Sequence, residues 1–346
     1  MKMKLLIPIA FKNHELAEDG DEIVLAGDVG GTKANMMLCK LTEDGIETIK
    51  EERFPSKDHN SFAEILSQFL EGQPKPQKMC LSVAGPVLDG KVKFTNLSWQ
   101  IDSAEISEKL GGIPVAILND LEATAFGLAA LKPEELHLLH KGADETTGNA
   151  AILAPGTGLG EAGLFFDGKS FHPFATEGGH SDFAPRNEQD MQLLAYLQQR
   201  YHHVSWERML SGMGIVNIWQ FFRDVLKKES PEWLVKQMDE TDPAAVISKA
   251  ALEKTCDVCV EVIALFNHYL AIEAVNLVLK IKATGGLYIA GGITPKLLPL
   301  IDAKVWEEVF EGSGRMRQLM AQVTVNIMLN EKAPLLGAAY YAGGNM

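Results

Sequence analysis

The 346-residue chain has little cysteine and little positive charge. Its four cysteines are too few for a disulfide framework, and 32 Lys and Arg against 46 Asp and Glu leave a formal net charge of −14. No basic run interleaved with aromatic residues occurs, so we expect no nucleic-acid partner. An acidic protein that binds an anion must build positive potential locally, from backbone amides, helix N-termini and a metal ion.

The sequence also lacks a good export signal. The apolar run near the N-terminus is interrupted by Pro8, is followed at once by polar residues 12–15, and has no small-residue cleavage site. No segment approaches a membrane span by inspection. We therefore expect a cytoplasmic protein with no membrane partner.

Only one Cys-x-x-Cys pair is present, formed by Cys256 and Cys259. It has no second pair to complete a metal site, and it lies in the helix-like sequence 250–277. A buried helical pair is therefore favoured over a metal or redox site.

The chain does contain the same kind of glycine turn at two places. Residues 27–32 read Gly-Asp-Val-Gly-Gly-Thr, and residues 153–160 read Leu-Ala-Pro-Gly-Thr-Gly-Leu-Gly. Each turn follows a short apolar run and leads into another. Glycines permit tight turns and let N–H groups approach a ligand closely. The repetition predicts two halves that grip one anionic ligand, such as the phosphate tail of a nucleotide.

The sequence after the first turn argues against the two commonest nucleotide folds. The apolar run 34–39 is too short for a helix, and Glu43-Asp44-Gly45 then supplies hairpin-turn residues. A dinucleotide-binding or Walker loop would open a helix directly after its glycines. Thr32 also stands where the second glycine of a Walker loop should be.

The order of elements predicts two related α/β halves. Each half begins with three meandering strands, and the second continues through a long helical region from about residue 187 to 277. The expected strands are 23–26, 34–39, 46–54, 78–83, 114–118, 150–154, 161–166, an extended run to 175, and 287–290. The expected helices are 61–71, 102–110 and one from residue 121.

Six segments in a fixed order resemble the bacterial glucokinase family, ATP-dependent hexose kinases of the actin-like superfamily. They are residues 27–32, 118–123, 154–160, 177–185, 203–212 and 288–293. The resemblance covers roughly residues 23–342 and implies an α/β fold with two actin-like (ribonuclease-H-like) domains flanking a deep cleft. The smaller domain would comprise residues 22–128 plus about 328–346, and the larger one residues 129–327. Residues 1–21 would be an extension of unknown role, and a homodimer is also implied.

Two departures from related patterns matter. The first turn ends in Lys33, as in the related repressor–kinase family, where glucokinases typically have asparagine. Lys33 either adds charge to the phosphates or points to solvent. The cysteine-rich zinc motif of that related family is missing, so no zinc is expected, and residues 1–21 are too few for its DNA-binding domain.

Asp120 is the candidate catalytic base. It follows an apolar strand and begins a helix, and by resemblance it accepts the proton of the sugar 6-hydroxyl. The local sequence equally allows Asp120 to cap the helix that begins at Leu121. Both roles are compatible, because one carboxylate oxygen can cap while the other faces the substrate.

The resemblance also implies a set of sugar contacts. They are Asn96, Asn119, Asp120, Glu177, His180 and Glu207. Taken alone, the sequence favours a buried histidine at His180 and a first-turn acid at Glu207 in a helix capped by Ser205. Asn96 could instead serve loop structure.

The nucleotide is assigned to both glycine turns and to a third segment. The expected ATP contacts are Gly27, Asp28, Val29, Gly30, Gly31, Thr32, Gly156, Thr157, Gly158, Gly291 and Gly292. Asp28 would order Mg²⁺ through water, since Mg²⁺ keeps several waters and few carboxylates; turn formation is the alternative. Gly291-Gly292 would lie against adenosine, followed by Thr294 as an N-cap and Pro295 at the first helical position.

The predicted function is phosphoryl transfer from ATP to the 6-hydroxyl of glucose. Three alternatives stay open at this point. They are a kinase for another hexose or an N-acetylhexosamine, a sugar-sensing regulator without catalysis, and polyphosphate in place of ATP as the donor.

Overall fold

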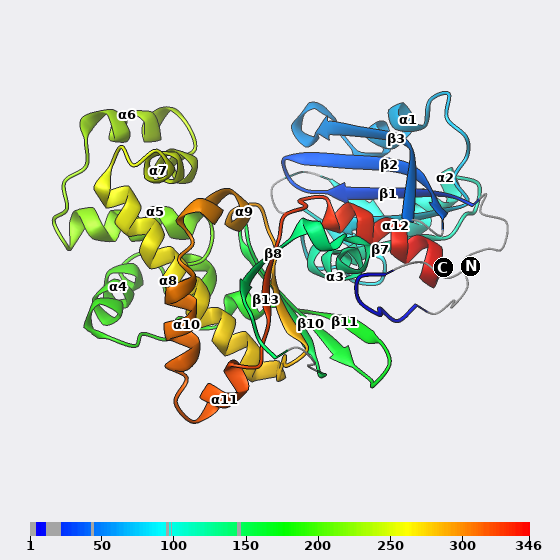
Figure 1. The fold of residues 1–346 in the computed structure, drawn as a ribbon. Helices are drawn as coiled ribbons and strands as arrows, with labels where there is room; N and C mark the ends of the chain where they lie inside the picture. The colour runs from blue at the N-terminus through cyan, green and yellow to red at the C-terminus, as the bar shows by residue number, and fades with distance from the viewer. Residues whose placement is uncertain (1–4, 12–21, 43–44, 95–96, 98, 144–146) are drawn as a thin grey trace. The chain divides into compact units, whose positions relative to one another are not determined.

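A computed structural model describes residues 5–11, 22–42, 45–94, 97, 99–143 and 147–346. These residues form two compact units (Figure 1). The first contains the described residues up to Glu135, together with Lys169–Ala175 and Asn330–Met346. The second contains Leu136–Gly168 and Thr176–Leu329. The chain thus leaves the first unit and returns to it at its C-terminus.

The first unit is built on a five-stranded sheet of order β3-β2-β1-β4-β7. Its strands are β1 (Ile23–Val29), β2 (Lys33–Thr42), β3 (Gly45–Pro55), β4 (Lys78–Val83) and β7 (Val115–Asn119). β1, β2 and β3 pair antiparallel as a meander, whereas β1, β4 and β7 run parallel. Each predicted strand of this half is therefore present. Of the predicted hairpin turn, residues 43 and 44 lie outside the described residues.

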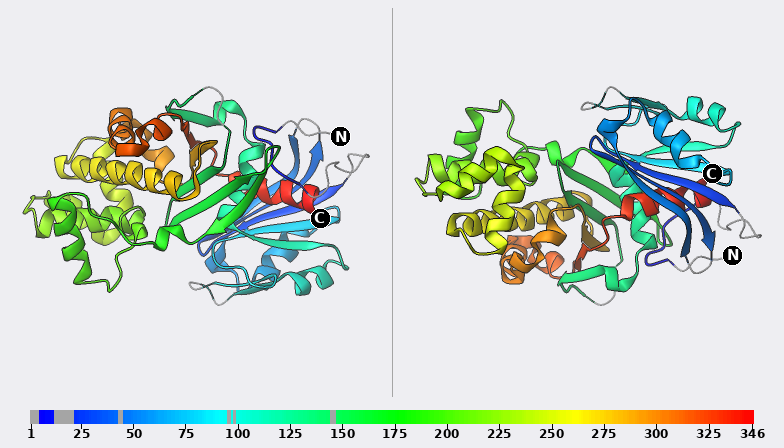
Figure 2. Two further views of the ribbon diagram at one scale, coloured as in Figure 1. Left: turned by 90° about the horizontal axis from the view of Figure 1, so that it is seen from below. Right: turned by 90° about the horizontal axis from the view of Figure 1, so that it is seen from above.

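Helices cover both faces of this sheet. α1 (Phe62–Leu70) and α2 (Ser103–Lys109) pack on the face that carries Leu25 and Val29. α12 (Ala333–Asn345), coloured red, packs beside β1, β2 and β4 (Figure 2). Because both faces are covered, the central residues of β1 read as a continuous apolar run with no exposed side chain.

The C-terminal helix α12 also packs closely against α3 (Asp120–Ala130). A Cβ atom added at Gly127 would lie 1.9 Å from the carbonyl oxygen of Ala333. One added at Gly337 would lie 1.8 Å from the carbonyl oxygen of Ala123. Glycine at these two positions therefore lets the two helix backbones approach each other.

The described part of the N-terminal extension packs on the first unit. The N–H group of Leu6 donates to the carbonyl of Ala129 at 2.9 Å, and Ile9 forms a parallel bridge with Phe171. The Phe11 ring lies 6.0 Å from that of Phe126, centroid to centroid. Residues 5–11 thus contact α3 and the segment 169–175.

The second unit repeats the plan with five strands in the order β10-β9-β12-β13-β8. They are β8 (Leu136–His140), β9 (Ala150–Pro155), β10 (Leu159–Phe166), β12 (Gly286–Ile289) and β13 (Val325–Met328). All of β11 (Phe171–Thr176) except Thr176 belongs to the first unit. β9 is antiparallel to β10 and parallel to β12, as β1 is to β2 and β4. The predicted structural repeat is confirmed, although β8 and β13 were not predicted.

Most of the α-helices among the described residues belong to the second unit (Figure 1). They are α4 (Glu188–Gln198), α5 (Gly212–Asp224), α6 (Glu232–Glu240), α7 (Pro243–Leu252), α8 (Asp257–Ile281), α9 (Thr294–Leu297), α10 (Ala303–Glu311) and α11 (Arg317–Met320). The short pair β5 (Lys91–Lys93) and β6 (Gln100–Asp102) belongs to the first unit.

Helix α8 corrects the expectation that no segment approaches a membrane span. Its 25 residues are long and apolar enough to cross a membrane by length and composition, with a mean hydropathy of 1.7 in the most apolar window. However, 72% of that window is buried inside the structure. The helix contributes Val262, Phe266 and Leu270 to the core of the second unit, and this burial explains its composition.

The cysteine pair lies partly outside a helix, contrary to the prediction. The helical sequence breaks after α7, where Lys254 has a positive φ of 53°. Cys256 therefore occupies the N-cap position of α8, and Cys259 lies in its first turn. Both thiols are buried, and burial raises the pKa of Cys259.

Candidate active site

The first glycine turn joins β1 to β2 and is held by a neighbouring segment. The N–H group of Gly30 donates to the carbonyl of Lys33 at 2.9 Å. Ser56 closes the outside of the turn: its Oγ donates to the Gly30 carbonyl at 2.8 Å, and its N–H to the Thr32 carbonyl at 3.0 Å. Thr32 itself is exposed, so the tip of a fixed turn is open to a ligand.

Asp28 lies below this turn, with both carboxylate oxygens hydrogen-bonded. Ser82 Oγ donates to Oδ1 at 3.0 Å from β4, and Asn35 Nδ2 donates to Oδ2 at 3.3 Å from β2. Burial raises the pKa of Asp28, while these two bonds and the charge of Lys33 act in the opposite direction. The two bonds run to neighbouring strands and fix the carboxylate at the end of β1.

This arrangement fits a water-mediated magnesium site. The two donors leave lone pairs on each oxygen of Asp28 that can accept from metal-bound water. No group of three or more His, Cys, Asp or Glu side chains that could hold a metal occurs among the described residues. Mg²⁺ bound with substrate phosphates needs only one or two carboxylates, so Asp28 meets its requirement.

Sequence reasoning missed the two partners of Asp28. Ser82 is fully buried in β4 between the apolar residues Leu81 and Val83, and Asn35 lies opposite Asp28 in the β1–β2 register. A lone polar residue inside a buried strand was the available signal, because such a group needs a hydrogen-bond partner.

The second glycine turn joins β9 to β10 and is held by a different set of contacts. Gly156 N–H donates to the Gly158 carbonyl at 2.8 Å, and Gly212 N–H donates to the Gly156 carbonyl at 2.9 Å. Thr157 at its tip is exposed, as Thr32 is in the first turn. The counterpart of Asp28, two residues before the first turn glycine, is here Ala154.

The predicted adenosine segment lies directly against this second turn. Gly291 has a φ of +82°, and a Cβ atom there would lie 2.3 Å from the carbonyl oxygen of Pro155. The structure therefore brings Gly291 together with the predicted phosphate residues of the second unit. The prediction that Thr294 caps the next helix is wrong: Thr294 is the first residue of α9, and Ile293 occupies the N-cap position.

Three predicted sugar contacts come together in the second unit. The 3₁₀ turns η3 (Gly178–His180) and η4 (Trp206–Arg208) adjoin through a bond from Trp206 N–H to the Ser181 carbonyl at 3.0 Å. Glu177 and His180 are exposed, so the alternative of a buried histidine is wrong. Ser205 does hold the N-cap position before Glu207, but its side chain makes no capping bond.

Glu207 connects these turns to the second glycine turn. Its Oε2 accepts the N–H of Leu159 at 3.1 Å, and a Cβ atom at Gly158 would lie 2.5 Å from the same oxygen. Glycine at position 158 therefore makes room for the Glu207 carboxylate. One carboxylate contacts both a predicted sugar turn and a predicted phosphate turn.

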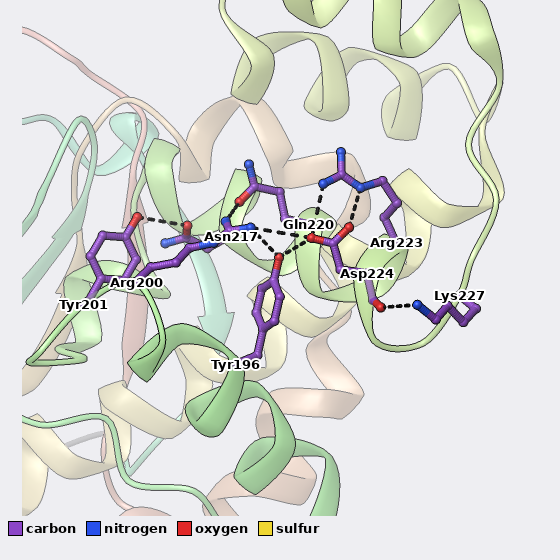
Figure 3. Close-up of polar contacts among 8 residues, drawn as sticks. All are labelled: Tyr196, Arg200, Tyr201, Asn217, Gln220, Arg223, Asp224 and Lys227. Atoms are coloured by element: carbon purple, nitrogen blue, oxygen red, sulfur yellow. Dashed lines mark hydrogen bonds and ion pairs between the residues drawn. The ribbon is translucent and has the colours of Figure 1, made fainter.

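A polar network on α4 and α5 supports the segment that carries Glu207 (Figure 3). Asn217 accepts from Tyr201 at 3.3 Å and donates to the Arg208 carbonyl at 2.9 Å. Further along α5, Asp224 accepts from the Tyr196 hydroxyl at 2.5 Å and pairs with Arg223. The first contacts hold the η4 turn, whereas those of Asp224 tie α4 to α5.

Asn119 and Asp120 lie at the junction of β7 and α3 in the first unit. The helix begins at Asp120, one residue before the predicted start, and Asn119 occupies the N-cap position. Asn119 Oδ1 and Asp120 Oδ1 each accept the N–H of Leu121 at 2.9 Å. Asp120 therefore does share in capping, which restrains its carboxylate at the end of the strand. Asn96 lies outside the described residues.

The first unit brings Asp28 and Asp120 to one edge of its sheet. The parallel register aligns Val29 with Val83 and Val83 with Asn119, so β1, β4 and β7 end level with one another. With neighbouring strands spaced by about 5 Å, the ends of β1 and β7 are about 10 Å apart. The carboxyl edge of a parallel sheet is where α/β proteins place ligands, and both acids lie there.

Comparison with known proteins gives a consistent result. The family model described as Glucokinase matches residues 25–345. The glucokinase of Nostoc punctiforme is 40% identical over 336 residues, covering 92% of this chain and 98% of the relative. That of Synechocystis is 36% identical over 344 residues, covering 92% and 97%.

Solved structures agree. The crystal structure of a glucokinase from an Antarctic psychrotroph matches with a TM-score of 0.80 and 30% identity, over 92% of this chain and 98% of that one. A ROK family glucokinase from Streptomyces griseus, in complex with glucose and AMPPNP, matches with a TM-score of 0.61 and 20% identity over 92% and 99%, which is a likeness of fold alone. The predicted actin-like fold class is confirmed by these matches and by the repeated sheets. The chain belongs to the glucokinase family.

Proposed function

We propose that this chain transfers the γ-phosphate of ATP to the 6-hydroxyl of glucose, giving glucose 6-phosphate and ADP. The observation that carries the proposal is the level ending of β1 and β7, which sets Asp28 and Asp120 at one sheet edge. Phosphoryl transfer needs an acceptor for the hydroxyl proton and a means of neutralising the phosphate charge. These two acids have the chemistry for the two tasks.

In this mechanism Asp120 is the general base. Its shared bond to Leu121 N–H keeps the carboxylate oriented at the helix start, and the sugar 6-hydroxyl gives its proton to it. Asn119, held by its bonds to Leu121 and to the Gly85 carbonyl, presents an amide to a second sugar hydroxyl. Asn96 is proposed to join them.

The second unit supplies the remaining sugar contacts. Glu177, His180 and Glu207 accept or donate hydrogen bonds at the ring hydroxyls, and sites that pair with hydroxyls reject sugars that lack them. The predicted phosphate residues are Gly27, Val29, Gly30, Gly31 and Thr32 in the first unit and Gly156, Thr157 and Gly158 in the second. The N–H groups of Gly30 and Gly156 donate within their own turns, so the proposed phosphate donors are the N–H groups of Gly31, Thr32, Thr157 and Gly158. Gly291 and Gly292 leave a flat backbone surface for adenosine.

Magnesium would be held at Asp28 through water and would neutralise charge on the phosphate oxygens. Asp28 itself is the residue that orients this water shell, since its carboxylate is fixed by Ser82 and Asn35. Zinc has no part in the proposal.

The test is the Asp120→Asn variant, which keeps the acceptor oxygen that caps α3. Loss of the base should lower kcat by about 10²- to 10⁴-fold while glucose still binds. ADP release is measured with a coupled assay, and glucose binding by calorimetry. A purified, folded variant with a kcat like that of the wild type would refute the assignment of the base.

A panel of sugars at equal concentration, each with ATP and then with polyphosphate, tests the substrates. Glucose with ATP should be turned over fastest. Faster turnover of another hexose or of an N-acetylhexosamine, or faster turnover with polyphosphate, would replace that part of the proposal. Binding without any turnover would point to a sugar-sensing regulator.

We also propose a homodimer in the cytoplasm. The dimer rests on the resemblance to the family, and light scattering after size-exclusion chromatography tests it. The cytoplasmic location is supported by the state of the cysteines: all four are free and buried, as is usual where thiols stay reduced.

A further inference from the structure

Two buried carboxyl groups in the second unit share one positive partner. Glu161 on β10 is 1% exposed, and Glu273 on α8 is 0% exposed. Glu273 Oε1 pairs with Lys280 Nζ at 3.1 Å, and its Oε2 accepts from Asn276 Nδ2 at 2.8 Å. The two carboxyl groups lie within reach of each other, and two buried carboxyl groups with a single positive partner favour a state in which one of them carries a proton.

The proton belongs on Glu161. Burial, and next the charge of Glu273, raise the pKa of Glu161 to about 8, against a smaller opposing effect of Lys280. Burial also raises the pKa of Glu273, but its bonds to Asn276, Lys280 and Glu161 all favour the ionised form. Glu161 Oε1 has no hydrogen-bond partner, whereas both oxygens of Glu273 have one.

This pair lies directly beneath the predicted sugar turn. A Cβ atom at Gly178 would lie 2.0 Å from Glu161 Oε2 and 2.7 Å from its Cδ. Gly178 stands next to Glu177 and two residues before His180, so the Glu161 carboxyl packs against the backbone between two proposed sugar contacts.

Two further contacts tie the pair to the same turn. Thr176 Oγ1 donates to the Glu161 carbonyl at 2.9 Å and accepts the N–H of Gly178 at 3.2 Å. On the other side, Lys280 Nζ reaches Ser181 Oγ at 3.4 Å. The charged groups that act on Glu161 are thus Glu273 and Lys280, both from α8. In β9, Leu153 lies opposite Glu161, and the side chains of Glu177 and His180 in the turn are exposed to solvent.

We propose that Glu161 and Glu273 are positioning residues for sugar binding, which hold the turn 177–180 in its binding shape while they share one proton. When Glu161 gives its proton to solvent, two buried carboxylates face one lysine. Their repulsion moves the Glu161 side chain against Gly178 and displaces the turn. This inference rests on the proposed function, since it assumes that Glu177 and His180 contact the sugar.

The test is the pH dependence of KM for glucose in the wild type and in Glu161→Gln. The glutamine amide donates to Glu273 as the protonated acid does, but it does not titrate. In the wild type, KM for glucose should rise about tenfold between pH 7 and pH 9, because one pH unit above the pKa leaves only about a tenth of the Glu161 side chains protonated. The pH dependence of kcat at saturating glucose should be the same in the wild type and in Glu161→Gln. In Glu161→Gln, KM should stay flat.

Two controls separate a titration from a loss of packing. Glu161→Ala removes the contact with the turn and should raise KM at every pH. Glu253→Gln changes an exposed carboxylate after α7 and should keep the rise of the wild type. A Glu161→Gln profile that rises like the wild type would overturn the inference while leaving the kinase activity established.

A second readout does not depend on activity. Because folding raises the pKa of Glu161, the wild type should lose stability as pH rises from about 5 to 8, and Glu161→Gln should lack this loss. The Tm of the variant relative to the wild type should therefore increase over that range. A Tm difference between Glu161→Gln and the wild type that does not change with pH would refute the inference that Glu161 and Glu273 share a proton. If the wild type does not turn over glucose at all, both the proposed function and this inference are refuted.

Discussion

The two glycine turns have the same backbone plan but different supports. The first has Asp28 two residues before its glycine, held by Ser82 and Asn35. The second turn has Ala154 at that position. Its neighbouring carboxylate belongs to Glu207, which comes from a distant segment and accepts the N–H of Leu159. In the proposed function this difference divides the tasks of a repeated fold: the first turn would supply the carboxylate that orders the magnesium water shell, while the second connects through Glu207 to the predicted sugar turns.

Among changes to the two turns, the largest effect should come from removing the charge that distinguishes the first turn. Asp28→Asn keeps an acceptor for Ser82 but loses the anion that orders the metal-bound water. We expect kcat to fall about 10²- to 10³-fold, with glucose binding unchanged, in a coupled ADP assay. Asp239→Asn on exposed α6 is the control and should behave like the wild type. An equally active Asp28→Asn protein would contradict the division of tasks.

The same substitution has a pH signature in stability. Because burial raises the pKa of Asp28 in the folded state, the wild type should become less stable as pH rises above the ordinary value of 3.8. Asp28→Asn should not show this loss, so its stability relative to the wild type should increase from pH 4 to pH 7. Urea denaturation at the two pH values measures the difference.

The next largest effect should come from the support of the second turn. Gly291→Ala places a Cβ atom 2.3 Å from the Pro155 carbonyl oxygen at a φ of +82°. We expect a loss of about 1–3 kcal/mol in the free energy of unfolding, from urea denaturation. Gly156→Ala is the matched control, because its nearest atom would be 3.9 Å away. Equal stabilities of the two variants would show that the contact between Gly291 and Pro155 is not rigid.

A smaller effect should follow from pushing Glu207 away from the second turn. In Gly158→Ala the new Cβ atom would lie 2.5 Å from Glu207 Oε2, so the side chain must move and its bond to Leu159 is lost. We expect KM for glucose to rise about tenfold, the equivalent of one bond to a charged group. Gly156→Ala should leave KM for glucose unchanged. A Gly158→Ala protein altered only in its KM for ATP would argue that Glu207 does not serve the sugar.

The smallest effect should come from Asp224, which supports neither turn (Figure 3). Arg223 and then Tyr196 lower its pKa to about 2, so its stabilising effect is present above about pH 4 and is lost as pH falls toward 2. The pair is partly exposed, and Asp224→Asn should cost less than about 1 kcal/mol at pH 7. Kinetic constants should be unchanged; a changed KM for glucose would extend the sugar support to this end of α5.

The strands and the turns could be predicted because their signals are local. Apolar runs that end near glycine predicted the first residue of β1 and of β9 correctly, and both ends of β12 to within one residue. For β4 both predicted ends agree with the structure. Glu177 was predicted as a site residue by resemblance, whereas Asp28 and Gly156 were predicted from the two glycine turns. Their roles stay predictions, but the structure shows which of them lie together.

What could not be predicted depends on contacts between distant segments. Nothing near Gly158 indicates that Glu207 fills the space beside it, and nothing near Gly178 indicates Glu161. A charged residue in each of two apolar segments, Glu161 in β10 and Glu273 in α8, was the available sign. Their pairing required the three-dimensional structure, because register and helix packing decide which buried charges meet.

The close contact of α3 with α12 has a consequence for synthesis of the chain. The helix that begins with Asp120 packs against residues 333–345, through Gly127 and Gly337, and these residues are synthesised after the whole second unit. The first unit therefore lacks a core helix until residues 333–345 are made, whereas Leu136–Gly168 and Thr176–Leu329 of the second unit are already present. A nascent chain truncated before Ala333 should accordingly be unable to assemble the half that holds the proposed base, so catalysis should require α12.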